Sequence, residues 1–147
     1  MLTRLSVYMN DRLIGIDFGL SKVGLSISDP LKIISIPLKV IKYKKRDDLL
    51  SRLKEIAIEN DVKSFVIGYP LNMNNKKNEM TKLVDDLFEE LINLNFNVFL
   101  QDERLSSESA KKIMHEQKIK TGKNKEQIDL IASTIILQSF LDKGAFK

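Results

Sequence analysis

Three carboxylates stand at positions where the elements of an α/β sheet would bring them together. Asp17 ends a short apolar run, Glu103 ends another near the middle of the second half, and Asp129 opens the last apolar stretch. Ligands gather at the carboxyl ends of the strands in such sheets. A cluster of carboxylates is costly unless cations neutralise it, and hard oxygen ligands favour magnesium or manganese over zinc.

Each of these acids also has a purely structural interpretation. Asp17 precedes Gly19 and could be a turn residue that accepts hydrogen bonds from nearby N–H groups. Glu103 could form an ion pair with Arg104 or with a lysine. Asp129 could be an acid that the dipole at a helix N-terminus favours. The elements that position these residues must therefore decide between the two interpretations.

The first part of the chain predicts three antiparallel strands. Apolar and alternating runs indicate strands over 13–18, 23–28 and 33–41. The link over 19–22 is too short for a crossover helix, so the first two strands should pair antiparallel. Pro37 favours an edge position for the third strand.

The remaining chain alternates helices and strands. Asp47 or Asp48 is expected to cap the first helix, and Ser106 or Ser107 a later one. The elements expected in order are a helix from there that Asn60-Asp61 ends, a strand over 64–69, a helix over 80–92, a strand over 97–101, a helix through 114 and a helix from 127 to about 142. This order predicts one α/β domain over residues 1–147, with a mixed five-stranded sheet and helices on both faces.

Composition and charge narrow the classes of partner. The chain has no cysteine, which excludes disulfides, and a net charge of +4. No apolar run approaches the length of a membrane span, so a cytoplasmic protein is expected. Lysine and arginine are concentrated over 39–54 and 111–125. Two such surfaces suit a nucleic acid, although a lysine-rich surface can also serve solubility alone.

Four motifs in order carry a resemblance to a known family. They are Gly15-Ile16-Asp17-Phe18-Gly19 with Val23-Gly24, then Val66-Ile67-Gly68-Tyr69-Pro70-Leu71-Asn72, then Asp102-Glu103-Arg104-Leu105-Ser106, and finally Ile128-Asp129 leading into Ile136-Leu137-Gln138-Ser139. Together they resemble the YqgF/RuvX family, the Holliday-junction-resolvase-like proteins described as pre-16S rRNA nucleases. The resemblance runs from about Leu13 to Asp142.

The resemblance implies a ribonuclease H-like fold and metal-dependent hydrolysis of phosphodiesters at the 5′ end of pre-16S rRNA. Asp17 would bridge two magnesium or manganese ions, and Glu103 and Asp129 would each hold one. Arg104 would contact the scissile phosphate or orient Glu103, and Lys22 and Asn72 would hold the substrate backbone. Nucleic acid is the implied partner, with ribosomal particles as a further one.

The sequence also departs from the family pattern. Residues 73–78 contain no glycine, and a fourth acid is not obvious, Asp102 and Glu126 being the candidates. Three other functions stay open: a resolvase of four-way DNA junctions, a non-catalytic RNA-binding factor of ribosome assembly, and an ATPase of the actin-like or sugar-kinase type. The chain is short for the last of these, which normally has a duplicated domain.

Overall fold

A computed structural model describes residues 11–72, 74, 76–103, 112, 115, 116 and 125–144, with residues 125–129 described by their backbone alone. In chain order these residues form β1 (Leu13–Asp17), β2 (Lys22–Ser28), β3 (Ser35–Lys42), α2 (Arg46–Glu59), β4 (Ser64–Tyr69), α3 (Glu79–Asn93), β5 (Asn97–Asp102) and α5 (Lys125–Lys143).

The strands form one five-stranded sheet in the order β3-β2-β1-β4-β5. β1 pairs antiparallel with β2, and β2 pairs antiparallel with β3. β1 pairs parallel with β4, and β4 pairs parallel with β5. The predicted mixed sheet is therefore confirmed, and the carboxyl ends of β1, β4 and β5 meet at the same end of the sheet.

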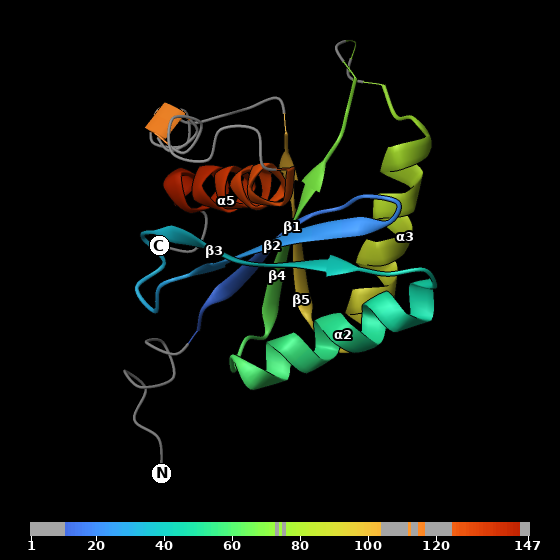
Figure 1. Ribbon diagram of the computed structural model, residues 1–147, viewed down its shortest axis with the longest axis horizontal. Coiled ribbons are helices and arrows are strands. Elements are labelled where there is room, and N and C mark those ends of the chain that lie inside the picture. Colours follow the sequence, from blue (N-terminus) through green and yellow to red (C-terminus); the bar gives the residue numbers. More distant parts are fainter. Residues whose placement is uncertain are drawn as a thin grey trace.

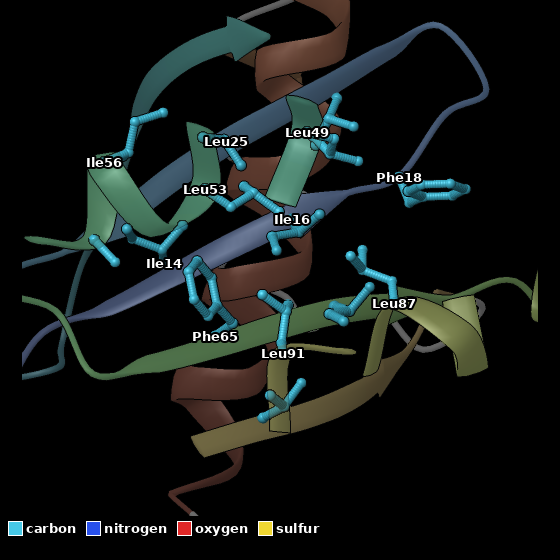
Figure 2. Packing of buried hydrophobic residues seen from close by; sticks show 14 of the residues in the cluster. Ile14, Ile16, Phe18, Leu25, Leu49, Leu53, Ile56, Phe65, Leu87 and Leu91 are labelled. Carbon is cyan, nitrogen blue, oxygen red and sulfur yellow. The ribbon is translucent and has the colours of Figure 1, made fainter. Parts of the chain in front are cut away.

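Helices cover both faces of this sheet, as predicted (Figure 1). On one face, α2 and α3 contribute Leu49, Leu53, Ile56, Leu87 and Leu91 to a buried cluster with Ile14, Ile16, Leu25 and Phe65 of the strands, as Figure 2 shows. On the other face, α5 packs across all five strands. Strand positions therefore alternate between a face that points to α2 and α3 and a face that points to α5.

Pro37 lies in β3, the edge strand of the sheet, where the sequence predicts it. The register between β2 and β3 shifts here, since Leu25 pairs with Lys39 and Ser26 pairs with Pro37. Proline cannot donate a ladder hydrogen bond and is tolerated at edges and bulges. The predicted place of this strand is confirmed.

The predicted cap of α2 is wrong. Lys45 is the N-cap residue and makes no side-chain cap hydrogen bond, while Asp47 and Asp48 lie inside the first turn. There their charges interact with the positive end of the helix dipole instead. A capping box does exist at α3, where Asn78 and Thr81 satisfy each other's backbone N–H groups. The cap predicted at Ser106 or Ser107 lies outside the described residues.

A turn follows β2 at Asp29-Pro30, and its hydrogen bonds yield a stability prediction. The Asp29 carboxylate accepts hydrogen bonds from the N–H groups of Ile33 (2.7 Å), Ile34 (2.8 Å) and Leu31 (3.2 Å). Partial burial alone would raise its pKa, but these bonds outweigh burial and lower the pKa from 3.8. We expect Asp29→Ala to cost about 1 kcal/mol of unfolding free energy at neutral pH.

The pH dependence distinguishes the charged cap from mere loss of side-chain atoms. Because the folded-state pKa of Asp29 is lowered, its stabilisation is fully present above 3.8 and is lost as the pH falls through the folded-state value. Thermal unfolding of Asp29→Ala and wild type should therefore converge in strong acid. Asp86→Ala, at an exposed position of α3, is the control. A difference that persists unchanged in acid would contradict the prediction.

Candidate active site

Asp17 and Glu103 project from the face of the sheet that α5 covers. A Cβ atom added to Gly15 would lie 2.7 Å from the Leu137 Cβ atom of α5, so Asp17, two residues further along β1, faces the same way. On β5, the ring of Phe99 contacts Phe140 of α5 at 5.2 Å between centroids. Because side chains alternate along a strand, Gln101 and then Glu103 lie on the same face as Phe99, the face toward α5.

Gly68 of β4 lies between the two acids. The pairing of Ile16 with Ile67 brings Asp17 level with Gly68. A Cβ atom on Gly68 would lie 2.5 Å from Glu103 Oε1 and 2.6 Å from Ile136 Cδ1. The carboxylate of Glu103 therefore lies over bare β4 backbone, directed toward the strand that carries Asp17.

The environment of Glu103 disfavours its charge. The residue as a whole is exposed, yet its carboxyl end lies against the β4 backbone at Gly68. This burial, followed by the negative charge of Asp102, raises the pKa of Glu103 above 4.5. A carboxylate held in such a place gains from a nearby positive charge, which a bound cation would supply.

The backbone of α5 leads Asp129 toward these acids. Leu141 shares a buried cluster with Leu13 at the start of β1, and Ser133 donates a hydrogen bond to the Gly15 carbonyl (2.9 Å). Going from Leu141 back to Ser133 along α5 corresponds to going from Leu13 to Gly15 along β1, so the N-terminal end of α5 lies toward the carboxyl end of β1. Asp129 stands one helical turn before Ser133. The side chain of Asp129 lies outside what the structure describes.

The described side chains therefore bring two of the three predicted ligands onto one face. Among those side chains, no group of three His, Cys, Asp or Glu residues is arranged to hold a metal ion. The assignment of Asp17, Glu103 and Asp129 as a metal site stays a prediction.

A close contact between α5 and the first two strands escaped the sequence reasoning. The Ser26 hydroxyl donates to the Ser133 carbonyl (2.8 Å), and the Ser133 hydroxyl donates to Gly15. A Cβ atom on Gly15 would collide with the Ser26 hydroxyl. Small residues at all three positions were the only signal, and they could not reveal which segments meet. This contact fixes the distance between α5 and the part of the sheet that carries Asp17.

Two glycine substitutions should separate the fold from the site. Gly68→Ala would push mainly against the ends of the Glu103 and Ile136 side chains, and also against Glu103 Cγ (3.0 Å), so we expect little change in melting temperature but a roughly 10–100-fold loss of metal affinity or activity. Gly15→Ala would press on the Leu137 Cβ atom and the Ser133 carbonyl and should cost about 1–3 kcal/mol of unfolding free energy. Thermal unfolding and cleavage assays on both variants test this. Full activity of a folded Gly68→Ala protein would contradict it.

The predicted substrate-binding residues have different surroundings. Lys22 is half-buried at the start of β2. The Asn72 side-chain oxygen accepts the N–H groups of Asn74 (3.0 Å) and Lys76 (2.8 Å), so it holds the loop after β4 in shape. Arg104 lies outside the described residues. Their roles toward a substrate stay predictions.

Neither candidate for a fourth acid is placed beside Asp17 and Glu103 by the described side chains. Asp102 pairs in register with Tyr69 and so occupies the opposite face of the sheet from Glu103. Its charge nonetheless contributes to the raised pKa of Glu103. The side chain of Glu126 lies outside what the structure describes.

One residue of the first basic cluster has a structural role. The Arg46 guanidinium donates to the Leu83 carbonyl (3.0 Å), pairs with Glu90 (3.1 Å) and lies 5.5 Å from the centre of the Phe18 ring. Arg46 therefore joins α2 to α3 rather than serving as a surface cation. Most of the second cluster, over 111–125, lies outside the described residues.

Comparisons with known proteins agree with this architecture. The family profile described as "RuvX: Holliday junction resolvase" matches residues 11–143. A protein of Ruminiclostridium cellulolyticum named "Putative pre-16S rRNA nuclease" is 40% identical over 91% of this chain and 96% of its own length. A protein of the same name from Streptococcus equi subsp. zooepidemicus is 41% identical over 89% and 97%.

Solved structures extend the likeness to the fold. Thermus thermophilus RuvC in complex with a Holliday junction substrate superposes with a TM-score of 0.60 at 10% identity, over 92% of this chain and 97% of that one. The Fowlpox virus resolvase in complex with Holliday junction DNA gives a TM-score of 0.56 at 9% identity, over 91% and 99%. These likenesses show the ribonuclease H-like fold that the family resemblance implies. In the described part of the chain, no helix is both long and apolar enough to cross a membrane.

Proposed function

We propose that this chain, which belongs to the RuvX family, is a metal-dependent nuclease that processes the 5′ end of pre-16S rRNA in the cytoplasm. The names of its relatives supply the substrate class. The observation that carries the proposal is the placement of the Asp17 and Glu103 side chains on one face at the carboxyl end of the sheet, on either side of bare Gly68.

The residues present fit two divalent ions. Asp17, Glu103 and Asp129 offer only hard oxygen donors, which suit magnesium or manganese. Burial and the charge of Asp102 disfavour the ionised form of Glu103. A cation beside this carboxylate would offset that unfavourable free energy. When bound, such ions lower the pKa of a water molecule and stabilise the leaving oxygen of an in-line displacement.

The protein's own contribution is positioning. Asp17 ends a central strand that is hydrogen-bonded on both sides, so its backbone is fixed relative to β4 and β2. Glu103 is held at the end of β5 by the hydrogen bond from its N–H to the Tyr69 carbonyl (3.3 Å). Lys22 and Arg104 supply the positive charges that would orient a substrate phosphate.

A cleavage assay on two substrates tests the proposal. Purified protein is incubated, across a manganese titration, with a transcript spanning the 5′ end of pre-16S rRNA and with a four-way DNA junction. We expect the transcript to be cut at one position and the junction to be left intact. Cleavage of the junction alone would replace the substrate by branched DNA, and cleavage of neither would favour the non-catalytic RNA-binding alternative.

A further inference from the structure

We propose that a groove beside the β1–β2 turn binds a backbone phosphate of the nucleic-acid strand, away from the bond that is cut. The inference deepens the proposed nuclease function and rests on it. The groove has a volume of about 620 Å³ and is lined by Ser21, Lys22, Lys42, Tyr43, Lys44 and Asp48.

The strand register places Lys22 and Lys42 on the α5 face near the candidate active site, whereas Tyr43 packs with the cluster on the α2 face, so the groove lies at the end of the sheet. Lys22 and Lys42 are direct partners on β2 and β3. Ser26 of β2 contacts α5, so the even-numbered positions of β2, Lys22 included, lie on the face that also carries Asp17. Asp17 pairs with Gly24, and Lys22 is two residues from Gly24, about 7 Å along the strand.

The groove is rigidly joined to the turn that follows Asp17. The Tyr43 hydroxyl donates to the Gly19 carbonyl (2.6 Å), and the Tyr43 N–H donates to the Ser21 carbonyl (3.1 Å). A Cβ atom on Gly19 would lie 2.5 Å from the Lys22 carbonyl oxygen, so the turn is closed tightly on itself. A ligand in the groove is therefore kept at a fixed distance from the Asp17 carboxylate.

The lining favours a phosphodiester over a base. Three lysines face one carboxylate, that of Asp48, so the groove is positively charged. Its remaining polar side chain with an exposed hydroxyl is Ser21, and the Tyr43 hydroxyl is already bonded to the turn. Ammonium and hydroxyl groups contact phosphate oxygens without reading sequence. The groove would thus set the position of the strand along the site.

Paired lysine substitutions test the groove in the Asp17→Asn background, where binding is measured without cleavage. Lys42→Gln/Lys44→Gln removes two groove charges, and Lys63→Gln/Lys82→Gln removes two exposed charges outside both the groove and the basic clusters. Fluorescence anisotropy follows a labelled single-stranded RNA from the pre-16S 5′ end over a salt titration. We expect the groove variant to bind roughly tenfold more weakly and to lose about 0.7 from the salt slope, the value for one phosphate of a single strand, with the control variant unchanged and both melting as the parent does.

Neutral methylphosphonate linkages, placed one at a time in the same RNA, identify the phosphate. One position should weaken binding of the parent protein but not of the groove variant. The proposed phosphate site would be contradicted if both lysine variants lost RNA affinity equally. It would also be contradicted if the sensitive methylphosphonate still weakened binding of the groove variant. If the RNA binds in the groove but wild type cuts nothing, the nuclease proposal fails and the groove stands. If wild type binds no RNA, both fail.

Discussion

Asp17→Asn is expected to abolish metal-dependent cleavage while nucleic-acid binding and folding persist. Asparagine keeps the shape of the side chain but cannot supply the negative charge that would bridge two cations. Loss of outer-shell partners of metal sites already costs 10–100-fold, so loss of a residue proposed to hold the metal directly should cost more than about a hundredfold. Single-turnover cleavage of the pre-16S transcript, with anisotropy for binding, measures the two effects separately.

Asp61→Asn is the matched control for this substitution. Asp61 is exposed, lies before β4 at the opposite end of the sheet, and has a positive φ of 54° that asparagine also tolerates. We expect it to cleave as wild type does. In cells, Asp17→Asn should let pre-16S rRNA accumulate. A cell in which Asp17→Asn fully replaces wild type would refute the catalytic role and support an RNA-binding assembly factor.

The sheet could be predicted because its determinants are local. The short link over 19–22 forces β1 and β2 to pair antiparallel, and the period-two pattern assigns faces to the strands. Parallel crossovers through α2 and α3 then place β4 and β5 beside β1. Those rules alone predict that Asp17 and Glu103 lie at the same end of the sheet.

What could not be predicted depends on which distant residues meet. Spacing cannot tell an N-cap aspartate from one in the first turn, which is why the cap at Asp47 or Asp48 is wrong. Arg46 stands in a basic run, and only the tertiary structure shows its pairing with Glu90 of α3. Likewise, the hydrogen bonds between Ser26 and Ser133 and the placement of Glu103 over Gly68 need α5 and β5 in place.

Glu103→Gln is expected to stabilise the metal-free protein at neutral pH while removing its response to metal. Because burial and Asp102 raise the folded-state pKa of Glu103, its charge destabilises the folded state at neutral pH. In wild type, the stability linked to this group is fully present below 4.5 and is lost as the pH rises through the raised folded-state value. Glutamine stays neutral, so the melting temperatures of variant and wild type should differ at neutral pH and converge in acid.

Metal should reverse the order of stability. A cation that binds the folded wild type at about 100 times its dissociation constant adds about 2.7 kcal/mol to the unfolding free energy, whereas Glu103→Gln should gain little. Glu89→Gln, on an exposed position of α3, should respond to manganese as wild type does. If Glu103→Gln instead melts lower without metal at neutral pH, the carboxylate already has a stabilising partner within the protein. It would then have no need of a cation, and the metal site would lose its strongest support.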